Sequence, residues 1–211
     1  MQAIYVCLLA SLVSSYLLFS VNAQGENAFD NNINRCLFDG WSRGRSAVLN
    51  AKMECRGRSY AGLCYGLRRG TALYAVCYNQ NTLIPEFSGH VVAPLGRNQA
   101  AATGRHGFRN EGGRYAPKTQ TDEKEDYEKY SQKPIIPKFD DKRRFFNRGH
   151  LTPNEAFDDD NERELTFVNT NVAPQWVAFN SENWGKVESA VKRYANQNNR
   201  KVYVVTGTGK N

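Results

Sequence analysis

The placement of the cysteines constrains this chain more than any other feature of its sequence. All five lie before Asn81, and four of them follow the apolar N-terminus, at Cys36, Cys55, Cys64 and Cys77. An even number in an exported chain predicts two disulfides, for which three pairings are open. A zinc site is not favoured, because neither C-x-x-C nor H-x-x-x-H occurs. The disulfides can therefore stabilise only the N-terminal third, and packing must hold the rest.

The N-terminus predicts export. Residues 3–21 are apolar and uncharged, and Val21-Asn22-Ala23 is a small-residue cleavage site. We expect residues 1–23 to be a signal peptide, whose removal also removes Cys7, and the protein to be secreted. The alternative is an uncleaved membrane anchor. No later stretch of about 18 apolar residues occurs, so no stable membrane association is expected after signal removal.

Composition bounds the class of protein. The 211 residues carry 28 Lys and Arg against 21 Asp and Glu, a net charge of +7, and 40% are hydrophobic. These values exclude wholesale disorder, and the basic balance favours a polyanionic partner. The length predicts one main domain. We place a disulfide-tied lead-in at residues 24–70 and the main domain at residues 71–211.

Local patterns predict an α+β fold with a central antiparallel sheet. Residues 71–78 and 82–92 are strand-forming runs around a turn, which predicts a hairpin. Residues 201–205 predict a further strand, followed by a turn over residues 206–209. A long surface loop is expected over 93–121 and an exposed acidic turn over 157–162. The charge run over 122–130 is expected to be a solvated helical turn or linker.

One helix is predicted to begin near Asn180, which is a plausible N-cap. Its apolar positions recur at the spacing of a single helix face: Trp184, Val187, Val191 and Tyr194. Asn180, Trp184 and Glu188 are four residues apart, so their side chains should lie along one side of this helix. Lys192 continues the same row and adds positive charge.

Residues 147–188 bring together the groups that phosphodiester hydrolysis requires. His150 follows Arg148 and Gly149 in a turn-forming segment, and a neutral imidazole can accept a proton from water. Charge on the phosphate oxygens must also be neutralised, and Mg²⁺ prefers oxygen ligands and keeps several waters. The amide oxygen of Asn180, completed by waters, suits such an open metal site.

The same segment resembles the DNA/RNA non-specific endonuclease family, the ββα-metal nucleases. The family signature, D-R-G-H before a small-residue and proline segment, reads Asn147-Arg148-Gly149-His150-Leu151-Thr152-Pro153 here. The elements N-x-x-P-Q and N-x-x-x-W-x-x-x-E follow in the family's order, from Asn171 and from Asn180. The hairpin, with the run 83–88, is similar to the family's opening strands. The resemblance covers roughly residues 70–209.

This resemblance implies a ββα-metal nuclease fold and a secreted endonuclease that cleaves DNA and RNA with little sequence preference. His150 would be the general base. Asn180 would be the one direct protein ligand to Mg²⁺, for which Mn²⁺ can substitute, and Glu188 would orient the waters of the metal. The family attacks with water and leaves 5′-phosphate ends.

The resemblance also implies residues that hold the phosphate. Arg148 and Asn171 would support the site and the phosphate, and Lys192 falls where the family places a basic residue. A further family arginine lies between the opening strands and the R-G-H motif, and Arg109 and Arg114 are both candidates for it.

Two features depart from the family pattern. Asn147 replaces the usual Asp, which removes one negative charge beside the site. The chain also stops just after Val-Val-Thr-Gly-Thr-Gly, where family members continue, so we expect a C-terminally truncated domain with a complete catalytic set. The alternatives are a non-catalytic secreted binder of nucleic acids or other polyanions with a nuclease-like fold, and a structural disulfide-rich secreted protein. These residues predict no oligomeric state.

Overall fold

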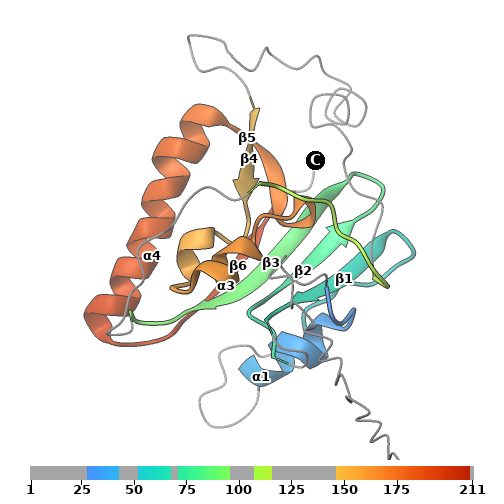
Figure 1. The fold of residues 1–211 in the computed structure, drawn as a ribbon, viewed down its shortest axis with the longest axis horizontal. Coiled ribbons are helices and arrows are strands. Elements are labelled where there is room, and N and C mark those ends of the chain that lie inside the picture. The colour runs from blue at the N-terminus through green and yellow to red at the C-terminus, as the bar shows by residue number, and fades with distance from the viewer. Residues whose placement is uncertain (1–27, 43–51, 68–70, 96–106, 116–145, 210–211) are drawn as a thin grey trace, which may run out of the picture.

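The computed structural model describes residues 28–42, 52–67, 71–95, 107–115 and 146–209. The fold is α+β, and these residues form two antiparallel sheets (Figure 1). The larger sheet has the strand order β1 (Tyr60–Tyr65), β2 (Tyr74–Asn79), β3 (Ile84–Val92), β6 (Val202–Gly207). The smaller sheet pairs β4 (Phe146–His150) with β5 (Val172–Trp176).

Short helical segments and one long helix complete the fold. Two lie near the N-terminus, η1 (Asn34–Phe38) and α1 (Asp39–Trp41). Three connect β4 to β5: η2 (Asn154–Ala156), α3 (Asp160–Glu164) and η3 (Asn169–Asn171). The turn η4 (Phe179–Trp184) and the long helix α4 (Gly185–Asn198) connect β5 to β6. Among the described residues, no helix has both the length and the apolar character needed to cross a bilayer.

Strand β2 is buried on both faces and forms the centre of the core. Tyr74, Val76 and Tyr78 point to one face, where they pack in the cluster that also includes residues of α4 and of the connection between β4 and β5. Ala75 and Cys77 point to the other face, under η1 and α1. Successive side chains of a strand point to opposite faces, so β2 contributes side chains to both clusters. Helical segments cover both faces of the large sheet (Figure 1).

Two disulfides fasten the N-terminal segments to the large sheet. They join Cys36 to Cys64 and Cys55 to Cys77. The predicted pair of disulfides is therefore confirmed, with one of the three pairings selected. Cys64 of β1 and Cys77 of β2 lie in the cluster that η1 and α1 cover, so both bonds act on the same face of the sheet.

The predicted hairpin and the C-terminal strand are confirmed, with two corrections. Residues 60–65, expected in an irregular lead-in, form the edge strand β1, because they pair with β2 along their whole length. Thr206 and Gly207, expected in a turn, belong to β6, because both pair with β3. The predicted signal peptide, the charge run 122–130 and much of the predicted loop 93–121 lie outside the described residues.

The predicted N-cap role of Asn180 is wrong. The helical turn already begins at Val177, and the helical residue Ala178 precedes η4 with no side-chain cap. The carbonyl oxygen of Asn180 instead accepts a hydrogen bond from the backbone N–H of Gly185, five residues later. This is a π-helical turn, a feature found frequently at functional sites.

The inward row of the helix also differs from the prediction. Val187 and Tyr194 were expected on an apolar face, but they are 50% and 56% exposed. The more buried positions follow the spacing i, i+4, i+7, i+11: Trp184, Glu188, Val191 and Ala195. Glu188 therefore occupies a place in the row that faces the core, where an apolar residue is the norm.

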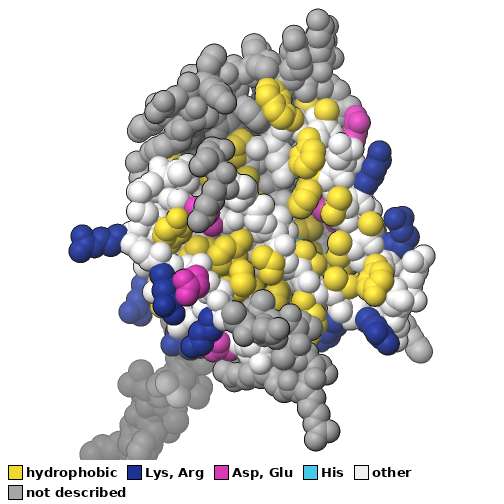
Figure 2. All heavy atoms as spheres, turned by 180° about the vertical axis from the view of Figure 1, so that it is seen from behind, with side chains coloured by type: hydrophobic (Ala, Val, Ile, Leu, Met, Phe, Trp, Pro, Cys, Tyr) yellow, Lys and Arg dark blue, Asp and Glu magenta, His cyan; other side chains and the backbone are white. Residues whose placement is uncertain are grey.

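The surface opposite to the view of Figure 1 is apolar at its centre, and Lys and Arg side chains stand around its edge (Figure 2). The edge strand β6 has Tyr203 and Val205 more than two fifths exposed, while the alternating Val202 and Val204 pack against the core. The centre of the face in Figure 2 therefore offers few Lys or Arg side chains to a polyanion.

Candidate active site

His150 ends strand β4, where it pairs with Val172 at the start of β5. Its imidazole packs against Phe108 and Phe167, with ring centroids 5.2 and 4.9 Å away. This burial lowers the pKa of His150 to about 4, because the charged imidazolium is poorly solvated there. Its Nε2 is buried and has no hydrogen-bond partner among the described residues. The ring is therefore neutral at physiological pH, with one nitrogen left for a ligand or water.

Arg148 lies two residues earlier on β4, and its guanidinium stands 5.1 Å from the centre of the Phe108 ring. Phe108 thus contacts both basic residues of the R-G-H motif. Asn147, which replaces the family's Asp, accepts a hydrogen bond from the backbone N–H of Arg148 at 2.9 Å. An aspartate could accept the same bond, so the substitution preserves this local contact and removes only the charge.

Gly149 joins two of the sequence motifs in space. The side chain of Gln175, from the N-x-x-P-Q motif, crosses directly over its Cα, and a Cβ at position 149 would overlap the Gln175 side chain. Arg148 and Gly149 pair with Pro174 and Ala173 across the two strands. The glycine therefore allows a close approach between the motif that carries His150 and the motif on β5.

Asn171 has no exposed surface and acts within the protein. Its side-chain amide forms two hydrogen bonds with the backbone of Thr152. Oδ1 accepts from the Thr152 N–H at 3.0 Å, and Nδ2 donates to the Thr152 carbonyl at 2.9 Å. Nδ2 also donates to the carbonyl of Thr166 at 3.0 Å. Asn171 was expected to support the site and the phosphate, and in the structure its side chain holds the loop that follows His150.

Glu188 lies on the inward row of α4, and its carboxyl group has a raised pKa of about 7. The main cause is burial, which disfavours the carboxylate, and the negative charge of Glu155 adds to it. A nearby cation would reverse this preference, because it stabilises the carboxylate. The carboxyl group of Glu188 is therefore ionised most readily when a cation lies close to it.

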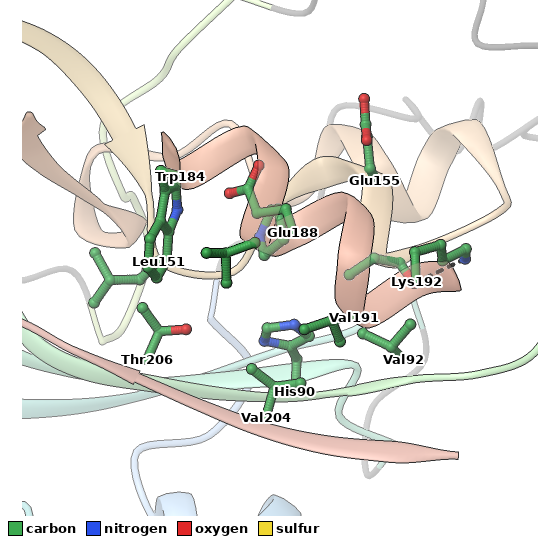
Figure 3. A pocket seen from close by; sticks show the side chains of 13 residues that line it. His90, Val92, Leu151, Glu155, Trp184, Glu188, Val191, Lys192, Val204 and Thr206 are labelled. Atoms are coloured by element: carbon green, nitrogen blue, oxygen red, sulfur yellow. Dashed lines mark hydrogen bonds between the residues drawn. The ribbon is translucent and has the colours of Figure 1, made fainter. Parts of the chain in front are cut away.

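Two cavities open beside Glu188. A small one of about 40 Å³ lies between α4, η2, β3 and β6, and its lining includes His90, Trp184, Glu188 and Thr206 (Figure 3). A wider groove of about 470 Å³ runs along the outer side of η4 and α4 and includes Ser181, Glu188 and Arg193. Glu188 borders both. Neither cavity includes His150 or Asn180 in its lining.

Lys192 is engaged inside the protein. Its ammonium forms an ion pair with the carboxylate of Asp158 at 2.7 Å and a longer bond of 3.4 Å to the carbonyl of Ala156. Its side chain is only 17% exposed. Lys192 was expected among the substrate contacts, and in the structure it joins α4 to the segment between η2 and α3.

The two candidate arginines differ in position. Arg109 pairs its backbone with residues 167 and 169, next to the Phe167 ring that contacts His150, and its Nη1 donates to the carbonyl of Glu164 at 3.0 Å. Arg114 is exposed and stands 5.6 Å from the ring of Tyr115. Arg109 is therefore the candidate that contacts the surroundings of His150.

The donor groups of this region fit a hard divalent cation held mostly by water. Among the described residues, no three His, Cys, Asp or Glu side chains gather as a metal cluster. Asn180 is half-buried in the π-helical turn, and Glu188 follows two turns later with its raised pKa. With the amide oxygen of Asn180 as the one protein ligand and Glu188 to orient waters, most coordination positions would be left to water, as Mg²⁺ prefers.

The sequence motifs did not reveal the contacts that position the candidate site residues. Phe108 contacts His150, Gln175 covers Gly149, and Thr152 receives the amide of Asn171. Gln175 and Thr152 lie within the motifs, so their positions were visible although their contacts were not. Nothing in the local pattern around Phe108 pointed to His150, because the two are 42 positions apart and meet only through the fold.

An antiparallel strand pair followed by a helix, with a neutral histidine at the end of the first strand, is the ββα arrangement expected from the motifs. The family model for DNA/RNA non-specific endonucleases matches residues 67–209. The chain belongs to this family.

Two curated relatives are salivary endonucleases of insects. The one from Lutzomyia longipalpis is 31% identical over 141 residues, covering 64% of this chain and 34% of the relative. The one from Culex quinquefasciatus is 28% identical over 161 residues, covering 72% of this chain and 41% of the relative. The chain thus spans between a third and a half of their length. Among solved structures, the EndoG/EndoGI complex matches with a TM-score of 0.44 and 21% identity, covering 64% of this chain and 49% of that chain.

Proposed function

We propose that this chain is a secreted, Mg²⁺-dependent endonuclease that hydrolyses the phosphodiester bonds of DNA and RNA with little sequence preference. The observation that carries this proposal is the neutral, packed imidazole of His150, whose buried Nε2 has no partner among the residues described. Membership of the nuclease family supports the reaction class. The two disulfides and the salivary relatives support secretion.

In this mechanism His150 accepts the proton of the attacking water at Nε2, while Phe108 and Phe167 hold the ring in place. Asn180 would hold the metal through its amide oxygen, and Glu188 would orient the coordinated waters. When bound, Mg²⁺ neutralises charge on the phosphate and on the leaving oxygen. The water oxygen bonds to phosphorus as the bond to the 3′ oxygen breaks, and the 3′ oxygen takes a proton from a solvent water. The products are a 5′-phosphate and a 3′-hydroxyl.

Arg148 supplies positive charge on the same strand as His150, and Arg109 is our choice for the further family arginine. Contacts of this kind are made to phosphates and carry no sequence information, so low sequence preference follows. We assign Asn171 the support of the site rather than a contact to the substrate, because its amide is buried and bonded to Thr152 and Thr166.

The purified chain incubated with plasmid DNA and with RNA tests the proposal, in Mg²⁺ and in EDTA, beside His150→Ala. We expect metal-dependent cleavage and a loss of about 10²–10⁴-fold in the variant, the range typical of a general base. Activity of His150→Ala within a few-fold of the native chain would refute the role of His150. A folded native chain that binds nucleic acid without cutting it would favour the non-catalytic binder.

Asn180→Ala tests the metal ligand, with Asn198→Ala as the matched control at the exposed end of α4. The first variant should need a much higher Mg²⁺ concentration for half-maximal cleavage or lose activity, because it lacks the ligand oxygen. The second should titrate as the native chain does. Equal Mg²⁺ titrations for both variants would rule out Asn180 as the ligand.

A further inference from the structure

Thr152, two residues after His150, is fully buried and bonded at every polar group. Its backbone N–H and carbonyl are both held by the amide of Asn171, at 3.0 and 2.9 Å. The neighbouring Leu151 N–H donates to the carbonyl of Asn171 at 2.9 Å. The two residues that follow His150 are thus hydrogen-bonded to Asn171, the residue before β5.

The Thr152 side chain fastens the same loop to the large sheet. Its hydroxyl donates to Oγ of Ser88 at 3.0 Å and lies 3.3 Å from Nδ1 of His90. Ser88 and His90 are alternate residues of β3, so both point to the same face. A hydroxyl has one proton, and the bond to Ser88 uses it. The His90 contact is then completed by an Nδ1–H that donates to the Thr152 oxygen.

These polar groups lie where apolar side chains would normally pack. Ser88 and Thr152 have no exposed surface, and His90 is 1% exposed. A buried polar group that loses its hydrogen-bond partner destabilises the folded state, whereas apolar side chains in the same place would carry no such cost. When all its hydrogen bonds are formed, a buried polar network holds its side chains in one fixed arrangement. The three side chains therefore fix position as well as fill space.

His90 also reaches the helix that carries Glu188. Its ring stands up from β3 beneath α4, beside Val191 and below Glu188 (Figure 3). His90 and Glu188 line the same small cavity of about 40 Å³. The ring therefore touches the loop behind His150 on one side and the space under Glu188 on the other.

We propose that Ser88, His90 and Thr152 form a positioning network that sets His150 relative to Glu188. This rests on the proposed function, in which His150 accepts the proton of the attacking water and Glu188 orients the waters of the metal. The three are positioning residues and do not touch the substrate. Thr152 fixes the loop after His150 to β3, and β3 supports α4 through His90.

Thr152→Val tests the network, because valine keeps the shape and the backbone bonds and removes only the hydroxyl. Thr152→Ser is its matched control, because serine restores the hydroxyl. For the valine variant we expect kcat to fall about 10–100-fold with KM changed less than about threefold, as misplacement of a catalytic group does. The serine variant should stay within a few-fold of the native chain. Measurements are made well below the melting temperature of each variant.

A purely structural role would give a different result. Thr152→Val would then unfold at a lower temperature, while kcat of the folded enzyme would match that of Thr152→Ser. That outcome overturns the proposal. If Thr152→Val does not fold, Ser88→Ala and the pair His90→Leu and His90→Asn take its place. Asparagine retains an amide donor near the position of Nδ1. His90→Asn should therefore retain kcat and His90→Leu should not. Equal kcat values for these two variants would also overturn the proposal.

A spectroscopic readout separates this proposal from the proposed function. The chain has three histidines, so ring ¹H–¹⁵N signals of His150 can be assigned by their loss in His150→Ala. Thr152→Val should shift or broaden the His150 ring signals, and Thr152→Ser should leave them near native positions. A native chain that cuts nothing would refute the nuclease, yet these signals would still report whether the hydroxyl positions His150. Unchanged His150 signals in the valine variant would refute the network.

Discussion

His90 shows what a single buried polar residue does to stability. Burial lowers the pKa of this histidine from 6.5 to about 4, so the native state holds it neutral. In the unfolded chain it is protonated below pH 6.5. The unfolded state therefore binds more protons between pH 6.5 and 4, and the free energy of unfolding falls as pH decreases through this window.

We expect His90 to account for about 3 kcal/mol of stability lost between pH 7 and pH 4. His90→Asn keeps a polar group beside Thr152 and does not titrate, so its stability should fall less steeply over the same range. The measurement is urea unfolding of both proteins at pH 4, 5, 6 and 7. His150 has a pKa lowered in the same direction, and the comparison removes its contribution. Parallel pH profiles for the two proteins would contradict the prediction.

Single residues also show what the local sequence can indicate. The motif residues His150, Asn180 and Glu188 were selected because their chemistry and spacing are local properties of the chain. The same motif contained Thr152 and gave no indication of its role. Its partners Ser88 and His90 lie more than 60 positions earlier and reach it only when β3 takes its place in the sheet. Long-range contacts of this kind cannot be inferred from spacing.

The helix α4 shows the corresponding limit for an element. The periodicity correctly indicated a helix over this segment, but its buried row was misassigned at Val187 and Tyr194. The predicted and the observed rows both start at Trp184 and both fit a period of 3.6, so periodicity alone does not separate them. Apolar character favoured Val187 and Tyr194, whereas the packing of α4 on the sheet buries the row that contains Glu188 and Ala195. The edge strand β1 was missed because disulfides and glycines around it suggested irregular chain.

Two neighbouring cations on α4 should behave differently. Lys192 pairs with Asp158, whereas Arg193 is exposed and lines the groove beside Glu188. We expect Lys192→Ala to lower the free energy of unfolding by up to about 1 kcal/mol and to leave the salt dependence of nucleic-acid binding unchanged. Arg193→Ala should leave stability unchanged and reduce the slope of log K against log salt by about 1.

Binding is measured on the His150→Ala background, so that cleavage does not interfere. Asp158→Asn is the control for the ion pair and should match Lys192→Ala in stability. A reduced salt slope for Lys192→Ala would instead support the substrate contact that the family pattern implies.

The whole molecule carries a net charge of +7, which should govern its association with nucleic acid. Neutralised phosphates release counterions, so log K should fall linearly with log salt, by about 0.9 per phosphate contact on duplex DNA and about 0.7 on single strands. We expect at least a tenfold loss of affinity between about 50 and 200 mM salt for a few such contacts. A titration of fluorescent duplex and single-stranded oligonucleotides checks this. A flat salt dependence would exclude phosphate contacts as the source of affinity.

The two disulfides stabilise only one part of the molecule. Both disulfides act on the face covered by η1 and α1, and the β4–β5 pair with α4 contains none. The loop closed by Cys55 and Cys77 spans 22 residues, and its loss should cost about 3 kcal/mol. Cys55→Ser/Cys77→Ser should therefore unfold at lower urea concentration than the native chain. Equal midpoints for the double variant and the native chain would show that packing alone holds this face.

The close approach of Gln175 to Gly149 also bears on how such a site can change over generations. Any side chain at position 149 meets Gln175, so a substitution there is tolerated only after residue 175 has become smaller or has moved aside. The reverse order is open, because shortening Gln175 creates space and no overlap. Related chains should therefore show the two positions varying together, with a residue other than glycine at 149 accompanied by a small residue at 175.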